Sequence, residues 1–231
     1  RLKDVASLPL TKLFVGSEGT LGVITEVTVR LLPPQPPAST MVATFPSVQA
    51  AADAVLAITG TLRPAMLEFM DRVSVNAVED ALHMGLDRSA QALLIARSDA
   101  PGGAAAEEIA AMVRACHDCG ADEVFDTDDP DEGEAFAAAR RMAIPAVERT
   151  GSLLLEDVGV PLPALPALVG GVAAIAERNA VTVAVIAHAG DGNTHPLIVF
   201  DPADEDMTAR AHAAFGQIMD LAIGLGGTIT G

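Results

Sequence analysis

Aromatic side chains are almost absent from this sequence. Its 231 residues contain no tryptophan and no tyrosine, and only 7 phenylalanines. Half of the chain is nevertheless hydrophobic, so alanine, valine, leucine, isoleucine and methionine must fill the core through many small contacts. Because only 19% of the residues are charged, the composition excludes a disordered chain and predicts a globular protein with a sizeable core.

Cysteine is also scarce, and this excludes a disulfide framework. The two cysteines, Cys116 and Cys119, form a C-x-x-C pair. A redox motif would need a thioredoxin-like context, and a zinc site would need a second pair of ligands nearby. Since neither is present, we interpret the pair as two small residues on a helix.

Positive charge is outnumbered by negative charge. The 14 lysines and arginines stand against 31 aspartates and glutamates, which gives a net charge of −17. Such a surface repels phosphate backbones and therefore excludes nucleic acid as a partner. It also repels small anions at long range, so an acidic substrate would need a local positive group at its binding site.

No long apolar run is present. The longest, residues 181–187, is interrupted by Thr182 and is far shorter than the roughly 20 residues of a membrane-spanning helix. The first residues lead into no apolar segment typical of a signal peptide. We therefore predict a cytoplasmic protein without a transmembrane segment, and we keep peripheral membrane attachment as the alternative. The chain lacks an initiator methionine and stops in a β-prone piece at 226–231, which indicates a fragment.

A proline-rich stretch predicts a domain boundary. A glycine-rich turn leads into β-branched residues at 23–31, where we expect a strand. Four prolines in the five residues 33–37 then continue neither a helix nor a sheet. We expect residues 1–34 to close one domain, and residues 35–231 to form a second domain that is truncated at its C-terminus.

Beyond the prolines, predicted strands and helices alternate. This order favours an α+β sandwich, with an antiparallel or mixed sheet and helices mainly on one face. A doubly wound parallel sheet is the alternative. The strands are expected at 40–45, 65–70, 91–98, 123–126, 152–157, 181–187 and 197–200. The helices are expected at 48–59, 71–84, 101–119, 130–148, 162–178 and 203–224.

The strongest local signal is the segment His-Ala-Gly-Asp-Gly-Asn-Thr-His-Pro at 188–196. Its Asp-Gly and Gly-Asn pairs tolerate positive φ and are typical of hairpin turns. We therefore expect His195 to lie opposite His188 with Cβ atoms about 5 Å apart, which lets both imidazoles hold one metal ion. Two histidines on an ordinary hairpin are the alternative, although Pro196 fixes the backbone as a preorganised site requires.

Glycines at positions 16, 19 and 22 form a second signal. They allow backbone N–H groups to approach a ligand closely. Their spacing matches neither a Rossmann nor a P-loop fingerprint, and a glycine-rich turn into a strand is the alternative.

The pair Arg140 and Arg141 forms a third signal. A guanidinium group suits a substrate carboxylate because its planar fork matches the two oxygens. Paired arginines on a solvated helix face are the alternative.

Carboxylates occur at the ends of two predicted strands. Glu68 and Asp71 end the strand at 65–70 and begin the next helix, and we interpret Asp71 as a helix cap. Glu156 and Asp157 follow an apolar strand, where they either face a site or turn the chain and cap a helix.

Four segments together resemble one family. Gly-Ser-Glu-Gly-Thr-Leu-Gly-Val-Ile-Thr at 16–25 and Glu-Asp-Val-Gly-Val-Pro at 156–161 are similar to signatures of FAD-linked oxidases related to vanillyl-alcohol oxidase. The segment at 188–196 resembles the signature of the glycolate oxidase flavin subunit and of D-lactate and D-2-hydroxyglutarate dehydrogenases. The end at 226–231 resembles the lead-in to a Glu-His-Gly motif that this sequence lacks. The matches occur in the family's order and span nearly the whole chain.

The resemblance implies a ferredoxin-like cap domain over a flavin. It implies that His188 and His195 bind a divalent metal (zinc, manganese or iron), with a glutamate past Gly231 as the third ligand. Arg140 matches the family's arginine for the substrate carboxylate, and Asn193 is expected near the flavin or the substrate. The implied FAD contacts are Gly16, Ser17, Gly19, Thr20, Gly22 and Ile24.

Departures from the family pattern favour a small substrate. Leu155 and Leu197 replace a lysine and an asparagine of the 2-hydroxyglutarate enzymes, and Ala137 stands where an aromatic residue is frequent. We therefore expect FAD-dependent oxidation of glycolate or D-lactate to the 2-oxo acid, with hydride transfer from C2 to the flavin. Electrons would leave to a quinone, a cytochrome or a partner subunit.

Other functions are compatible with the same residues. We expect the fragment alone to be inactive, and a homo-oligomer is left open. The competing functions are a non-catalytic metal-binding module, a structural domain, and a relative of the ether-lipid alkyl transferase that performs no net oxidation.

Overall fold

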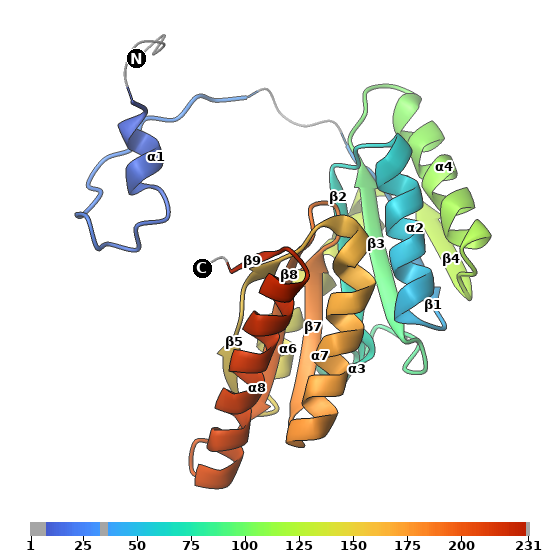
Figure 1. The fold of residues 1–231 in the computed structure, drawn as a ribbon. Coiled ribbons are helices and arrows are strands. Elements are labelled where there is room, and N and C mark those ends of the chain that lie inside the picture. The colour runs from blue at the N-terminus through green and yellow to red at the C-terminus, as the bar shows by residue number, and fades with distance from the viewer. Residues whose placement is uncertain (1–7, 33–36, 230–231) are drawn as a thin grey trace. The chain divides into compact units, whose positions relative to one another are not determined.

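The computed structural model describes residues 8–32 and 37–229 (Figure 1). These residues divide into two compact units, of which the first holds residues 8–32 and the second holds residues 37–229. The prolines at 33, 34 and 36 and the last two residues of the terminal motif lie outside the described residues.

The first unit contains a short helix, α1 (Leu10–Phe14), and no strand among its described residues. The strand expected at 23–31 is therefore wrong for this structure. A strand needs the backbone hydrogen bonds of a neighbouring strand, and no described segment pairs with these residues. The apolar side chains of the segment are correspondingly exposed, Val23 at 88% and Leu31 at 86%.

The second unit begins with a ferredoxin-like half. Its strands are all antiparallel and lie in the order β4-β1-β3-β2, with the helices α2 and α4 as connections and α3 inserted after β2. The elements of this half are β1 (Ser39–Phe45), α2 (Val48–Thr61), β2 (Met66–Asp71), α3 (Arg72–Leu82), β3 (Ala92–Ser98), α4 (Ala104–Asp118) and β4 (Glu123–Thr127).

A second half repeats the same arrangement in the order β9-β6-β8-β7. The strands β5 and β6 pair with β8 in one continuous register. Together they occupy the position that β1 has in the first half. The elements of this half are β5 (Ser152–Leu155), β6 (Val158–Gly159), a 3-10 turn (Leu162–Ala164), α7 (Leu165–Asn179), β7 (Thr182–His188), β8 (Asn193–Phe200), α8 (Glu205–Gly224) and β9 (Thr228–Ile229).

The two halves join into one nine-stranded sheet where β2 pairs with β7. The register aligns Glu68 with His188, Phe69 with Ala187, and Met70 with Ile186. We call this ladder the seam. It brings together residues that are about half the chain apart, and it places the end of β2 beside the start of the 188–196 hairpin.

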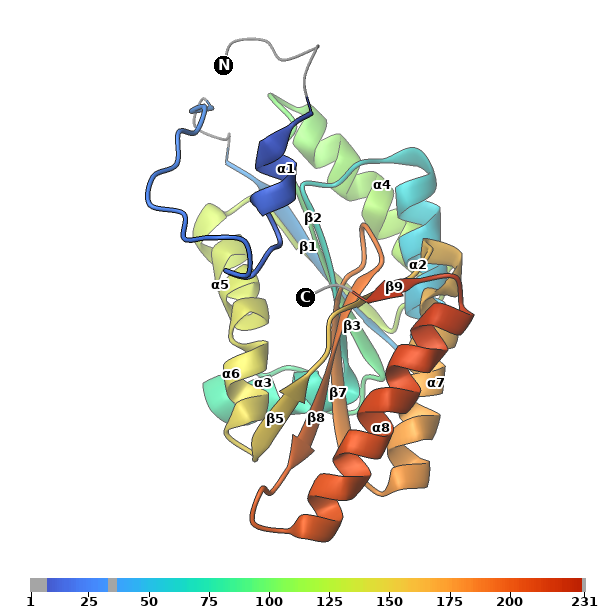
Figure 2. The ribbon, with the colours of Figure 1, turned by 60° about the vertical axis from the view of Figure 1, so that its left-hand side comes forward.

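Helices cover both faces of the sheet, as Figure 2 shows. The four longest, α2, α4, α7 and α8, cover one face with a core that includes Phe45, Ile58, Met112 and Leu168. The shorter α3, α5 and α6 cover the other face with a core that includes Val75, Ile95 and Leu197. The α+β class with an antiparallel sheet is confirmed, whereas the expected one-sided covering applies only to the four long helices.

The connection between the halves differs from the single helix expected at 130–148. It is two helices, α5 (Pro130–Arg141) and α6 (Ala143–Glu148), with a break at Met142. Pro145 accounts for the break, because its ring nitrogen has no hydrogen to donate to the carbonyl of Arg141 and its ring clashes with that carbonyl. A new helix begins instead, with Pro145 in its first turn. Arg140 therefore lies close to a helix end.

Four helices begin with a side-chain cap, among which Asp71 was expected. Ser47, Asp71, Asp129 and Asp204 each accept a backbone N–H from the first turn of α2, α3, α5 and α8. Such caps stabilise a helix by about 1 kcal/mol each. None of the helices in the described residues combines the length and the hydropathy that crossing a membrane requires.

Candidate active site

The two histidines of the 188–196 segment lie on the hairpin of β7 and β8. His188 ends β7, and β8 begins at Asn193, well before the strand expected at 197–200. His188 is opposite Asn193 and His195 is opposite Ile186, so the histidines are diagonal neighbours rather than the directly opposed pair that we expected. Their rings nevertheless meet edge to face with centroids 5.2 Å apart.

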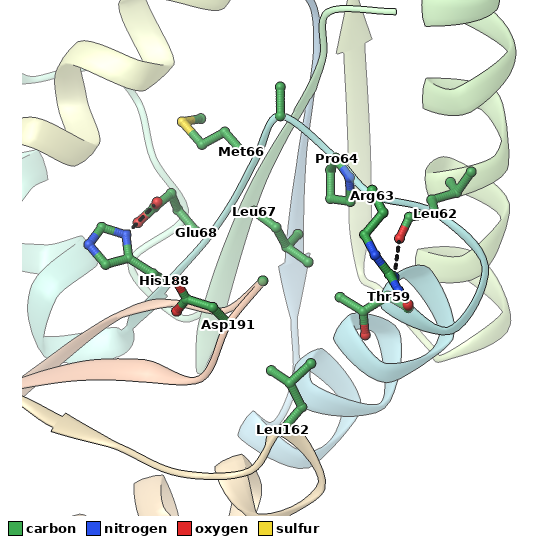
Figure 3. A pocket seen from close by; sticks show the side chains of 12 residues that line it. Thr59, Leu62, Arg63, Pro64, Met66, Leu67, Glu68, Leu162, His188 and Asp191 are labelled. Atoms are coloured by element: carbon green, nitrogen blue, oxygen red, sulfur yellow. Dashed lines mark hydrogen bonds and ion pairs between the residues drawn. The ribbon is translucent and has the colours of Figure 1, made fainter. Parts of the chain in front are cut away.

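His188 is held from across the seam by Glu68. The Nδ1 atom of His188 lies 2.7 Å from Oε1 of Glu68, whose side chain on β2 is buried (Figure 3). A carboxylate at this distance accepts a hydrogen from Nδ1. In the tautomer that donates this hydrogen, the lone pair of His188 lies on Nε2.

His195 has a carboxylate partner of its own. Its Nδ1 lies 3.6 Å from Oδ1 of Asp157, the residue that faces it on the neighbouring chain segment. Burial lowers the pKa of His195; Asp157 opposes this effect, and His188 adds to it. His195 is therefore a neutral imidazole at pH 7, which is the form that binds metals.

Arg140 reaches the same face of the sheet from the last turn of α5. Its Nη2 lies 2.8 Å from Oε2 of Glu68, and both side chains are about nine-tenths buried. The angles of this ion pair do not meet hydrogen-bond geometry, and neither Nε nor Nη2 of Arg140 has a hydrogen-bond acceptor among the described residues. A buried guanidinium group with open donors is costly unless an acceptor binds it.

A close helix–strand contact sets the position of α5. Gly133 packs so tightly against β1 that a Cβ atom there would lie 2.4 Å from Oγ1 of Thr40. A larger residue at this position would push the helix outward. Glycine therefore allows α5 to approach the sheet closely enough for Arg140 to reach Glu68.

A pocket of about 640 Å³ opens beside the pair of Glu68 and His188. Figure 3 shows these two side chains at one end of the pocket and Arg63 at the other. Nη1 of Arg63 donates to the carbonyls of Thr59 and Leu62, so this guanidinium group caps the end of α2. The pocket is otherwise lined mostly by apolar side chains.

The two histidines have some features of a metal site. Both imidazoles have Nδ1 near a carboxylate, which matches the way proteins orient histidine ligands. The described residues contain no group of three or more His, Cys, Asp or Glu that could hold a metal. His188 and His195 by themselves do not make a complete metal site among the described residues.

The glycine segment belongs to the first unit. Gly16 and Gly19 have φ values of +80° and +79°, which favour glycine. Together with their neighbours from Phe14 to Ile24 they line a hollow of about 570 Å³. A hollow with exposed backbone is compatible with a cofactor contact, and the predicted role in FAD binding stays a prediction.

The other carboxylates have different roles. Asp71 caps α3, as expected, and accepts the N–H of Ser74 at 2.8 Å. Glu156 neither caps a helix nor faces the histidines. Since neighbouring strand residues point to opposite faces, and Asp157 faces His195, Glu156 enters the core on the other side of the sheet. It is 3% exposed.

Comparison with known proteins identifies the family. The model of the C-terminal domain of FAD linked oxidases matches residues 35–231. The chain belongs to the FAD linked oxidases.

Two curated relatives are similar to this chain over nearly its whole length. "Glycolate oxidase subunit GlcD" of Bacillus subtilis is 37% identical over 99% of this chain and 49% of its own length. "Probable D-lactate dehydrogenase, mitochondrial" of Danio rerio is 32% identical over 99% of this chain and 46% of its own length. The chain thus spans about half the length of the curated relatives it matches.

A solved structure of an alkyldihydroxyacetonephosphate synthase shares the fold with a TM-score of 0.70 and 15% sequence identity. The match covers 99% of this chain and 47% of that chain. At this level of identity the likeness concerns the fold alone.

Within this FAD linked oxidase domain, the sequence named the histidines and Arg140 as candidates. It left open that Asp157 faces a site, and it gave Glu68 no functional role. Glu68 carries a sequence signal, because it is a charged residue inside the otherwise apolar stretch Met66–Met70. Pairing between β2 and β7 is what gives Glu68 its partner, and this pairing connects residues 120 positions apart.

Proposed function

We propose that this chain is the substrate-facing domain of an FAD-dependent 2-hydroxy-acid dehydrogenase that oxidises glycolate or D-lactate to the 2-oxo acid. The names of the relatives, glycolate oxidase and D-lactate dehydrogenase, support the substrate class. The observation that carries the proposal is the buried Arg140, which keeps open donors on the face of the sheet that holds His188 and His195.

Arg140 would bind the carboxylate of the substrate. The −17 net charge of the chain opposes the approach of an acid, so a local cation is needed where the acid binds. Glu68 engages Nη2 of Arg140 and leaves Nε as a buried donor. Charge-assisted hydrogen bonds to a carboxylate are about twice as strong as neutral ones, which favours the acid over an uncharged alcohol.

His188 and His195 would lie on the side of the site where the 2-hydroxyl group of the substrate binds. With Nδ1 of each ring near a carboxylate, their Nε2 atoms would hold a divalent ion such as zinc, manganese or iron, and Asn193 lies opposite His188 in the ladder. When bound, the ion would polarise the substrate hydroxyl, a base would take the hydroxyl proton, and FAD would accept the hydride from C2. The segment Gly16–Ile24 is proposed as the part that contacts FAD, within residues 1–34 as the end of an FAD-binding domain.

The assembly of the whole protein is part of the same proposal. A quinone, a cytochrome or a partner subunit would reoxidise the flavin, in the cytoplasm or at the membrane surface. Residues 35–231 would form the cap domain.

The test is flavin absorbance in a polypeptide that carries this chain together with an FAD-binding domain. Glycolate, D-lactate, L-lactate and D-2-hydroxyglutarate are added in turn, with and without a chelator. Bleaching by glycolate or D-lactate that the chelator abolishes supports the proposal. If the flavin- and metal-loaded protein is bleached by none of these acids, the dehydrogenase assignment fails and a non-oxidising transferase or a binding module takes its place.

A further inference from the structure

We propose that Glu68 is a positioning residue that holds the two halves of the substrate site, His188 and Arg140, in one fixed arrangement. This inference rests on the proposed function, because Glu68 would act through His188 and Arg140. Its support is geometric and comes from three contacting side chains on three different elements, β2, β7 and α5.

Each oxygen of the Glu68 carboxylate lies close to a different partner. Oε1 lies 2.7 Å from Nδ1 of His188, and Oε2 lies 2.8 Å from Nη2 of Arg140. The side chain is only 8% exposed and interrupts an apolar strand, where an unpaired carboxylate would be strongly destabilising. A glutamate at this buried position is therefore stable only because both partners are present.

For His188, the carboxylate fixes which ring nitrogen faces the site. Glu68 lies directly opposite His188 in the ladder of the seam, so the contact is set by the register of two strands rather than by a mobile loop. A hydrogen bond from Nδ1 orients the ring and directs the lone pair of Nε2 outward. Without Glu68 the ring is free to rotate and to exchange its tautomer.

For Arg140, the same carboxylate anchors one end of the guanidinium group. Glu68 forms an ion pair with Nη2, and the buried Nε donor has no acceptor among the described residues. Because the guanidinium group is rigid and planar, an anchor at Nη2 limits the positions that the remaining donors can take. One carboxylate thus couples the group that would bind the substrate carboxylate to the histidine on the hydroxyl side.

The matched control is Glu134, another glutamate that pairs with arginines. It contacts Arg97 and Arg141 on the same face of the protein, and its side chain is 53% exposed. Glu134→Gln removes an arginine ion pair beside α5 without reaching His188. Any effect of lost charge at this helix is therefore measured separately from an effect of Glu68.

The first readout uses the chain without metal or flavin. Long-range ¹H–¹⁵N spectra of the ¹⁵N-labelled protein at pH 8 report the tautomer of His188, which is assigned by comparison with His188→Gln. The expected result is the Nδ1–H form in the unsubstituted chain and in Glu134→Gln, and its loss in Glu68→Ala. Glu68→Gln, which preserves the shape if the alanine variant fails to fold, is expected to lose contact with one of the two partners, because its amide nitrogen cannot accept.

The second readout uses the flavin-loaded protein with an FAD-binding domain. Glu68→Ala and Glu68→Gln are expected to lower kcat/KM for the acid by about 10- to 100-fold, mostly through KM, whereas Glu134→Gln changes it less than twofold. An unchanged His188 tautomer in both Glu68 variants, or a KM equal to that of Glu134→Gln, overturns the proposal. The tautomer readout needs no turnover, so it tests Glu68 even if no hydroxy acid reduces the flavin.

Discussion

The sheet buries one glutamate on each of its faces, and the two side chains have opposite surroundings. Glu68, on the face covered by α3, α5 and α6, has Arg140 and His188 against its two oxygens. Glu156, on the face covered by the long helices, is 3% exposed, and its Oε1 has no hydrogen-bond partner among the described residues. Burial raises the pKa of Glu156 to about 7.

The two glutamates differ in whether polar side chains surround the buried carboxylate. A buried carboxylate retains its negative charge when cations and donors replace the water it has lost. Glu68 has Arg140 and His188 against its oxygens, from two other elements. Glu156 has no hydrogen-bond partner at Oε1 among the described residues, and burial raises its pKa.

The largest expected effect follows from removing the cation on the Glu68 side. Arg140→Ala leaves a buried carboxylate with one partner fewer, and breaking such pairs typically destabilises a protein by about 3–5 kcal/mol. Urea unfolding measures the change. Arg141→Ala on the exposed side of the same helix serves as the control, with an expected loss below about 1 kcal/mol. Equal losses in the two variants would show that Glu68 does not depend on Arg140.

Removing the charge of Glu156 is expected to stabilise the protein, and only at high pH. The carboxyl has a folded pKa of about 7 against an ordinary 4.5, so between these values the folded state binds a proton that the unfolded state has released. Stability contributed by this group is therefore lost as the pH rises through that window. Glu156→Gln should gain about 3 kcal/mol at pH 8 and almost nothing at pH 4.

Unfolding at both pH values tests this expectation. Glu148→Gln at the end of α6, on the other face, is the control. A gain at pH 8 that equals the gain at pH 4 would contradict a pKa of Glu156 that burial has raised.

A smaller effect is expected where α5 approaches the sheet. Glycine to alanine inside a helix normally stabilises by about 1 kcal/mol, and Gly170→Ala in α7 should do so because nothing lies within 4 Å of the new Cβ. Gly133→Ala places a Cβ at 2.4 Å from Oγ1 and 3.1 Å from Cβ of Thr40, and should destabilise by about 1–3 kcal/mol.

The shift of α5 should also move Arg140 from Glu68. Thermal unfolding of the two glycine variants, followed by KM for the acid, measures both consequences. If Gly133→Ala behaved like Gly170→Ala, the position of α5 would not depend on this contact.

Much of the fold follows from local sequence patterns. Period-two and helical patterns with capping residues such as Ser47 and Asp71 gave the alternating elements of the second unit to within a few residues. The helix expected at 130–148 was wrong in one respect, because Pro145 is tolerated only in the first turn of a helix and therefore begins a new one, α6. The strand expected at 23–31 failed because strand formation depends on a partner, and propensity alone does not supply one.

The site was only partly predictable for the same reason. The hairpin histidines are close in sequence, so turn chemistry was enough to bring them together, although their register differs from the expected one. Glu68 lies 120 residues before His188, and nothing local announces the pairing of β2 with β7. The repetition of the ferredoxin-like order in both halves was hidden because α3 and the α5–α6 connection interrupt the pattern.

The most direct test of the central claim is flavin reduction as a function of acid concentration in Arg140→Lys and Arg141→Lys. Arg140→Lys keeps the charge but loses the planar fork, and a hydrogen bond to a charged group contributes about 1.5–3 kcal/mol. The concentration of glycolate or D-lactate for half-maximal reduction should therefore rise about tenfold or more in Arg140→Lys and remain unchanged in Arg141→Lys. Equal concentrations for Arg140→Lys and the unsubstituted protein would show that the acid binds elsewhere.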